Sequence, residues 1–426
     1  MHATGPQHLS VIDDALIEVD DAGVIVDVRS LGPADGDEVA CDVRLKPGTM
    51  LMPGFVDTHL HAPQWPQLGS GLDLPLERWL HELTFPLEAR FADVDLAATV
   101  YNDMVPELLS LGATSVVYHS SVHREATLVL ADACVRHGQR ALVGRVAMDH
   151  SDATPEWYRD RDAASAVASS AGSIDDIMAL GSSRVAPIIT PRFIPACTDE
   201  TLAGLGRLAA ETDVIVQTHC SESDWQHGAV FERFGVTDTM ALDGFGLLRD
   251  HTVLAHATHL SADDADRIIE VGSGVAHCPM SNSYFANAVF PARRHIAAGM
   301  RVGLGTDVAG GPSPSIAEQV AHAVTVSRML NDGVDPGGAS GRDAASISMT
   351  TAFWMATLGG ADLAGLPVGV FERGRHFDAI VVDEPTATSG VDGLTAEVRL
   401  ERIIRSLVRS RPRRVWVDGV DVTPHR

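Results

Sequence analysis

The 426-residue sequence predicts an α/β protein: a (β/α)8 TIM-type barrel with a small β domain formed from the N- and C-terminal segments. Eight short apolar runs of the kind that form β strands alternate with stretches long enough to be crossover helices. Residues near both ends of the chain alternate between apolar and polar, which predicts further strands outside the barrel. The predicted boundaries are 1–50 and 371–426 for the two parts of the β domain and 51–370 for the barrel.

The two ends of the chain carry similar strand patterns. Residues 15–19 and 24–28 alternate apolar and polar side chains around an Asp-Ala-Gly sequence, which predicts a β hairpin within residues 11–48. Residues 377–382 and 414–417 show matching β-like runs near the C-terminus. We therefore expect the two ends to pair into one small β domain beside the barrel.

The predicted barrel strands are separated by helical stretches such as 201–211 and 261–271. In a (β/α)8 barrel the C-terminal ends of all eight strands converge on one mouth, where the active site lies. Polar residues at those ends are therefore candidate functional residues. The eight predicted strands cover residues 55–61, 114–118, 141–146, 185–189, 214–219, 252–256, 274–278 and 302–307.

The net charge of −25 argues against a nucleic acid or an anionic membrane surface as a partner. The five cysteines are scattered and form no C-x-x-C pair, which suits a reducing compartment. The first residues show no signal-peptide pattern, and no apolar run is long enough to span a bilayer. We therefore expect a cytoplasmic protein.

Polar residues that can bind a metal ion lie at the ends of several predicted strands. His59 and His61 are two residues apart in the first strand, so their side chains project from the same face. His219 ends the fifth predicted strand, His256 the sixth and Asp307 the eighth. A single histidine is more often a core or capping residue than a ligand. Imidazoles and a carboxylate that converge on one barrel mouth predict a site for zinc or ferrous iron.

Two other residues define the expected chemistry. Glu222 follows His219 by three residues, and the ordinary interpretation is a carboxylate at a helix N-terminus. Beside a metal-activated water, it would instead carry a proton from the water to the substrate. Lys46 is the only lysine of the chain, so no lysine from a central strand can bridge two metals as a carbamate. A single ion is therefore expected.

Several motifs resemble the amidohydrolase superfamily and, within it, the guanine deaminase branch. The general signature comprises Pro-Gly-Phe-Val-Asp-Thr-His-Leu-His (53–61), Thr-His-Cys-Ser-Glu (218–222), Leu-Ala-His (254–256) and Gly-Leu-Gly-Thr-Asp (303–307). The more specific motifs are His-Ala-Pro-Gln (61–64), Leu-Pro-Leu-Glu-Arg-Trp-Leu (74–80) with Thr-Phe-Pro (84–86), Thr-Pro-Arg-Phe (190–193), His-Cys-Pro (277–279) and Thr-Asp-Val-Ala-Gly-Gly (306–311). The resemblance covers nearly the whole chain.

The resemblance implies a metal-dependent hydrolase that acts on C–N bonds and converts guanine to xanthine and ammonia. It implies one Zn²⁺ ion, with Fe²⁺ as the alternative, and a homodimer. His256 would lie at the metal and hydrogen-bond the attacking water, and Glu222 would be the proton shuttle. The implied metal positions are His59, His61, His219 and Asp307, with His256 beside them.

The same resemblance implies that Gln64, Arg192 and Phe193 bind the substrate, with His219 and Glu222 also contacting it. An arginine fork suits the O6 and N7 acceptors of guanine, and an amide can both donate and accept a hydrogen bond. The alternative for Arg192 is a surface salt bridge. We favour the substrate role because Arg192 follows the fourth predicted strand directly, behind a proline.

Alternatives remain open for the substrate. Met280 stands where the family usually has asparagine, and the aromatic residues Tyr284 and Phe285 are either pocket walls or loop residues that shield the mouth. A pterin, an oxidised purine or an s-triazine is therefore an alternative substrate. A non-catalytic barrel used as a scaffold is disfavoured because no expected ligand is missing. A nucleic-acid deaminase is disfavoured because the H-x-E…P-C-x-x-C signature is absent.

Overall fold

The computed structural model describes residues 1–426 except 33–38, 287, 335–340, 386–392 and 425–426. Its central feature is an eight-stranded parallel sheet in the order β10-β8-β7-β6-β15-β14-β13-β12. The two outer strands of that order are joined by parallel bridges between Ile189 and Val216 and between Phe193 and His219. The sheet thus closes into a barrel, as predicted. Its strands are β6 (Phe55–His61), β7 (Ala113–His119), β8 (Arg140–Gly144), β10 (Val185–Pro187), β12 (Gln217–Cys220), β13 (Val253–His256), β14 (Gly274–His277) and β15 (Arg301–Leu304).

The barrel strands are short and almost completely buried. Every residue of β6 and β7 is buried, because one face of a barrel strand lines the barrel interior and the other packs against helices. Four strands differ from the prediction by more than one residue at one end. The fourth ends at Pro187 instead of residue 189, and the eighth ends at Leu304 instead of residue 307. The third strand ends at Gly144, and Val146–Ala147 forms a separate short strand, β9, that pairs with β11 (Thr190–Pro191). The fifth strand begins only at Gln217, after the chain has left α6 through Asp213 in a left-handed conformation (φ 56°).

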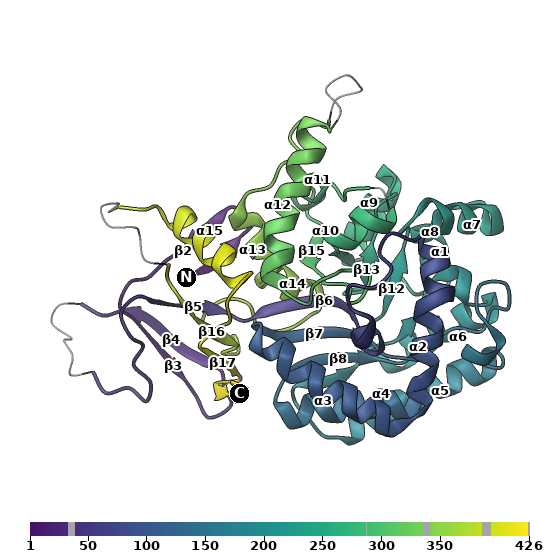
Figure 1. Ribbon diagram of the computed structural model, residues 1–426, viewed down its shortest axis with the longest axis horizontal. Coiled ribbons are helices and arrows are strands. Elements are labelled where there is room, and N and C mark those ends of the chain that lie inside the picture. Colours follow the sequence, from purple (N-terminus) through teal and green to yellow (C-terminus); the bar gives the residue numbers. More distant parts are fainter. Residues whose placement is uncertain (33–38, 287, 335–340, 386–392, 425–426) are drawn as a thin grey trace.

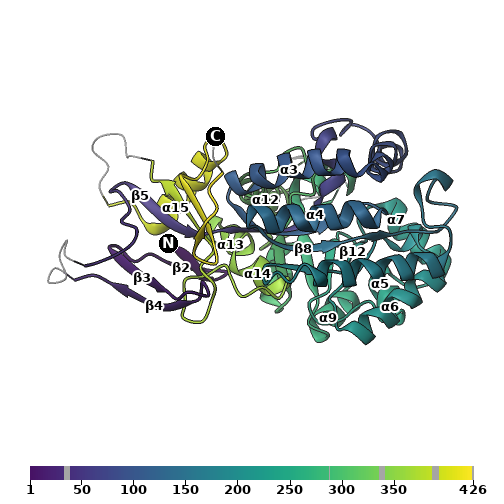
Figure 2. The ribbon, with the colours of Figure 1, turned by 90° about the horizontal axis from the view of Figure 1, so that it is seen from below.

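Helices surround the barrel on its outer side (Figures 1 and 2). The two stretches predicted as helices are α6 and α9, and Ser261 and Asp264 form a capping box at the start of α9. No helix among the described residues is both long and apolar enough to cross a membrane. The longer helices are α3 (Val94–Ser110), α4 (Arg124–His137), α5 (Ala163–Ala179), α6 (Asp199–Thr212), α7 (Asp224–Phe234), α9 (Ala262–Glu270), α12 (Ile316–Asp332) and α15 (Ala396–Leu407). The shorter ones are α1 (Leu76–Trp79), α2 (Phe85–Ala89), α8 (Asp238–Gly244), α10 (Pro279–Ser281), α11 (Ala292–Ala297), α13 (Met349–Met355) and α14 (Leu358–Leu363).

Antiparallel strands from both ends of the chain gather at one end of the molecule, beside the barrel (Figures 1 and 2). A four-stranded sheet has the order β18-β17-β16-β5, so the two ends of the chain do pair, but through residues 49–53 and not through the predicted hairpin, which forms its own two-stranded sheet. The predicted hairpin is present as β3 and β4; residues 33–38 of its expected segment lie outside the described residues. The division of the chain into domains stays a prediction. These strands are β1 (His2–Gly5), β2 (His8–Ser10), β3 (Ala15–Val19), β4 (Ile25–Ser30), β5 (Thr49–Pro53), β16 (Ala379–Asp383), β17 (Arg414–Val417) and β18 (Val420–Asp421).

A buried ionic cluster joins this sheet to the barrel. Arg140, the first residue of β8, donates to Asp378 with an Nε–Oδ2 distance of 3.0 Å and also contacts Asp418. Arg184 and His376 donate to the same Asp418 carboxylate at 2.8 and 2.7 Å. Because these charges are largely removed from water, each depends on its partners for compensation. The cluster therefore fixes how the two sheets lie against each other.

Candidate active site

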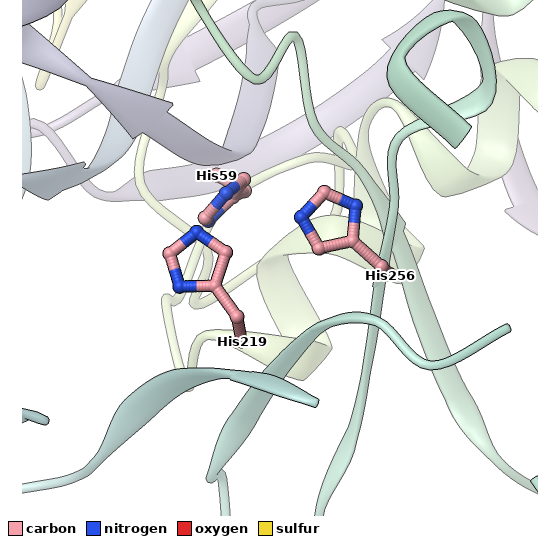
Figure 3. Close-up of side chains that lie close together, drawn as sticks. All are labelled: His59, His219 and His256. Carbon is pink, nitrogen blue, oxygen red and sulfur yellow. The ribbon is translucent and has the colours of Figure 1, made fainter. Parts of the chain in front are cut away.

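The structure brings the predicted strand-end residues together at one mouth of the barrel. His59 and His61 lie at the end of β6, His219 in β12 and His256 at the end of β13, and Asp307 follows β15 by three residues. Figure 3 shows the rings of His59, His219 and His256 directed toward a common space. All of these residues are buried.

Three imidazoles and one carboxylate are spaced as the ligands of one ion would be. His61 Nε2 lies 2.9 Å from His219 Nε2. Asp307 Oδ1 lies 3.2 Å from His59 Nε2 and 3.6 Å from His61 Nε2. Four ligand atoms at ordinary zinc distances in a tetrahedron are roughly 3.3 Å apart. The donor types and their separations therefore fit a metal ion.

Hydrogen bonds fix which ring nitrogens face the site. His219 Nδ1 donates to the carbonyl oxygen of Arg192 at 2.6 Å, and His256 Nδ1 donates to Asn282 Oδ1 at 2.9 Å. The lone pair of each Nε2 is consequently directed into the mouth. Both ring nitrogens of His59 and Nε2 of His256 are buried without a hydrogen-bond partner among the described residues. Buried polar atoms of this kind call for a ligand, and a cation satisfies them.

The electrostatic environment keeps these groups in their metal-binding forms. Burial lowers the pKa of His59, and it lowers the pKa of His61 and of His219 well below the usual histidine range. Burial acts to raise the pKa of Asp307, but the nearby His59 and His256 outweigh it and bring that pKa down to about 2. His59, His61 and His219 are therefore held neutral and Asp307 ionised, which is the state that binds a metal.

Glu222 lies beside the metal cluster, directly before Ser223, whose side chain caps α7. Its Oε1 is 3.7 Å from Nε2 of His256, and the carboxylate is buried. Burial raises the pKa of Glu222 to about 7, although His256 and Arg192 partly oppose the shift. A carboxyl group of this kind is suited to both accepting and donating a proton near neutral pH.

The sequence-based reasoning missed Glu88, a fully buried carboxylate on α2. Arg192 donates to it through both Nη atoms, at 2.6 and 3.1 Å. Gln64 Nε2 and the Tyr158 hydroxyl each donate to it at 2.8 Å. Arg192 is also buried, with its guanidinium 4.9 Å from the ring centre of Phe85. The surface salt bridge considered for Arg192 is therefore wrong: its carboxylate partner is inside the protein.

The orientation of the Gln64 amide follows from its two partners. Its Oε1 accepts a hydrogen bond from the backbone N–H of Ala309 at 3.0 Å, and its Nε2 donates to Glu88. A backbone N–H can only donate and a carboxylate can only accept, so the amide cannot be reversed. One Nε2 hydrogen of Gln64 remains available.

These residues line one pocket together with apolar side chains. Its polar lining includes Gln64, Arg192 and Glu222, and Phe193 forms part of the wall. Phe285 also lines it, with its ring centre 5.3 Å from that of Trp79. Tyr284 is 45% exposed and does not contribute to the described lining. The remaining lining residues are His61, Leu76, Trp79, Leu80, His219, Asp307 and Gly310.

A second residue missed from the sequence is His119, the last residue of β7. It lies opposite His61 of the neighbouring strand and is fully buried. The signal was present, because His119 directly follows the predicted strand 114–118. The strand-end rule that selected the other histidines would have selected it too.

Comparisons with known proteins agree with this site. Residues 50–422 match the amidohydrolase family. The chain is 35% identical to a probable guanine deaminase of Schizosaccharomyces pombe, an alignment that covers 96% of this chain and 79% of that one. It is 34% identical to the guanine deaminase of Mus musculus over 92% of this chain and 87% of the relative. The chain belongs to the guanine deaminase branch of the amidohydrolase family.

A solved structure supports the same membership. The guanine deaminase of C. acetobutylicum, solved with guanine bound in its active site, superposes with a TM-score of 0.87 and 29% identity. The match covers 99% of this chain and 97% of that one. The amidohydrolase family is metal-dependent, and the histidine and carboxylate groups described above are of the type that can hold an ion.

Proposed function

We propose that the protein is a zinc-dependent guanine deaminase, a hydrolase that converts guanine and water to xanthine and ammonia. One observation carries the proposal. A single buried pocket combines a histidine–aspartate metal cluster, the carboxylate of Glu222 and the donor groups of Arg192 and Gln64. The first group activates water, the second moves a proton and the third recognises a flat heterocycle with an acceptor edge.

We assign the metal to His59, His61, His219 and Asp307, whose donor atoms fit one ion. When bound there, a zinc ion supplies the positive charge that makes a water molecule acidic near neutral pH. His256 Nε2 lies 3.7 Å from Glu222 and 3.9 Å from Asp307 Oδ2. Polar groups at such separations can share one water molecule between them. His256 and Asp307 would thus orient the water for attack on C2 of guanine.

Glu222 is the residue we assign to proton transfer. It would accept a proton from the attacking water and deliver it to N3 of the ring, which lies next to C2. The same carboxyl group then assists the departure of the C2 amino group as ammonia. Its burial excludes bulk water from competing for the proton.

Arg192 and Gln64 are assigned to recognition of the ring. Glu88 engages two of the five N–H groups of Arg192, so the others remain available to the substrate. The fixed amide of Gln64 offers its remaining hydrogen as a donor, which revises the expectation that it both donates and accepts. Both residues therefore suit the acceptor atoms O6 and N7 of guanine. Phe193 and Phe285 would pack against the flat ring.

A pterin presents a similar carbonyl and ring-nitrogen edge, so the donors alone do not separate it from guanine. We expect ammonia release from guanine to exceed that from a pterin, an oxidised purine or an s-triazine. We also propose a cytoplasmic homodimer, with the five free cysteines in keeping with a reducing compartment. Size-exclusion chromatography with light scattering tests the dimer.

The decisive variant is Glu222→Gln in the zinc-loaded protein. It should retain the metal, measured by elemental analysis, and lose guanine turnover by about 10²- to 10⁴-fold, the range expected for a proton-transferring group. Glu232→Gln, an exposed site on the same α7 helix, is the matched control and should leave turnover unchanged. Robust turnover by Glu222→Gln, or preference for another heterocycle over guanine, would contradict the proposal.

A further inference from the structure

His119 is a histidine at the barrel mouth that the proposed mechanism does not use. The register of β6 and β7 pairs it with His61, so the backbone alone places it at the metal cluster. Its ring centre lies 4.6 Å from that of His61, 4.7 Å from His59 and 4.9 Å from His219. Four imidazoles from three strands thus crowd one small volume.

The environment of His119 does not explain it as a core residue. The side chain is fully buried, yet neither ring nitrogen has a hydrogen-bond partner among the described residues. Burying an imidazole without partners costs free energy that an apolar side chain of similar size would not. His219 and His256 use Nδ1 to donate to oxygen atoms, whereas His119, like His59, has no such contact among the described residues. An unpartnered buried nitrogen next to metal-type ligands points to a cation.

One ring nitrogen from each of His59, His61 and His119 forms a group in which every pair lies within 4.8 Å. Movements of a fraction of an ångström to about one ångström per side chain would bring such a group to ordinary zinc–nitrogen distances. His59 and His61 belong to this group and also to the set completed by His219 and Asp307. Because the two sets share His59 and His61, the positions at which they would hold an ion are adjacent. His119 adds a candidate ligand from β7.

We propose that His119 is a metal ligand, and that His59, His61 and His119 form an inner, all-imidazole ligand set at this site. The proposal deepens the proposed function, because it concerns the same metal site and rests on that site holding an ion. A further imidazole strengthens the binding of zinc and other imidazole-preferring metals relative to magnesium or manganese. We therefore expect the ion to bind more tightly than it would to His59, His61, His219 and Asp307 alone.

Metal affinity tests the proposal without any substrate. In competition with a chelator, His119→Phe should bind zinc at least about 10-fold more weakly than the unmodified protein, the lower end of losses seen when groups around a metal are removed. His295→Phe is the matched control, since His295 is also buried and stacks on Phe290 with ring centres 5.0 Å apart. It should bind zinc normally. Equal zinc affinity of His119→Phe and the unmodified protein overturns the proposal.

A measurement on the unmodified chain covers the case in which His119→Phe does not fold. In crystals of the zinc-loaded protein, a His119 nitrogen should lie about 2.0–2.1 Å from the anomalous zinc peak. A His119 nitrogen more than about 3 Å from every zinc peak overturns the proposal. Failure here with intact guanine turnover counts against His119 alone. Zinc at His119 in a protein that leaves guanine unchanged counts against the proposed substrate alone.

Discussion

Replacing Glu88 with glutamine tests whether the carboxylate positions the groups assigned to substrate recognition. Glu88 accepts hydrogen bonds from Arg192, Gln64 and Tyr158, and all of these partners are donors. Glu88→Gln keeps the size of the side chain but removes its charge and turns one acceptor oxygen into a donor NH₂. At least one of the partners then faces another donor, and the charge of Arg192 loses its counterion.

The size of the effect follows from burial. Glu88 is fully buried and Arg192 is 2% exposed, so water cannot replace the lost contacts. Removing one partner of a buried ion pair costs about 3–5 kcal/mol of stability. If about 2 kcal/mol of that loss is expressed as misplacement of Arg192 and Gln64 against the transition state, kcat/KM falls about 30-fold. We therefore expect both lower stability and poorer use of guanine.

Urea unfolding and the rate of guanine disappearance measure the two effects in the same preparation. Glu82→Gln, an exposed glutamate paired with Arg78, is the matched control and should leave both quantities unchanged. Glu88→Asp, which keeps the charge, should recover part of the lost activity. If Glu88→Gln is less stable but has the kcat/KM of the unmodified protein, Glu88 is only a structural residue and the positioning argument is refuted.

Two further predictions concern the metal and the ionic cluster between the sheets. Chelation should abolish turnover and lower the melting temperature, and added zinc should restore both. An ion present at about 1,000 times its Kd stabilises the folded state by about 4 kcal/mol. An unchanged melting curve after chelation would argue against a resident ion. At Asp418, burial acts to raise the pKa, but Arg140, Arg184 and His376 outweigh it and hold that pKa below its usual range. The ionised carboxylate therefore contributes stability that is complete above the unfolded-state pKa of about 4 and is lost as the pH falls through the lower folded value. Asp418→Asn should be about 3 kcal/mol less stable at pH 7 and should lose less stability on acidification. Urea midpoints at several pH values measure both effects, and equal midpoints for the variant and the unmodified protein would contradict the prediction.

The strand-end residues could be predicted from the sequence because one local rule determines them. A residue that ends an apolar β run lies at the barrel mouth, wherever the run occurs in the chain. The rule needs no knowledge of distances, and it led to His61, His219 and His256. It also applies to His119, which follows the predicted strand 114–118 directly but belongs to none of the motifs that carry the family resemblance.

The substrate side of the site could be predicted only in part. Arg192 and Gln64 were expected to bind the ring, but their partner Glu88 lies on a short helix outside the strand-end pattern. Arg192 and Glu88 are 104 residues apart, and Gln64 and Ala309 are 245 apart. No periodicity or spacing relates such positions, since their contact arises only when the barrel has closed. These contacts change how Gln64 can bind a substrate, because its oxygen is occupied by the Ala309 N–H and only an N–H donor remains free.

Strand β6 with the segment that follows it and the loop after β15 couple metal binding to substrate recognition. The Asp57 carboxylate accepts from the Thr306 hydroxyl at 2.5 Å, and the Asp307 N–H donates to the His59 carbonyl oxygen at 2.9 Å. Two residues beyond Asp307, the N–H of Ala309 fixes the amide of Gln64. A shift of either segment therefore moves both Asp307, which is assigned to the metal, and Gln64, which is assigned to the substrate. In this geometry metal affinity and KM for guanine should change in concert when Asp57 is altered, whereas changes at Glu88 should act on KM with little effect on the metal.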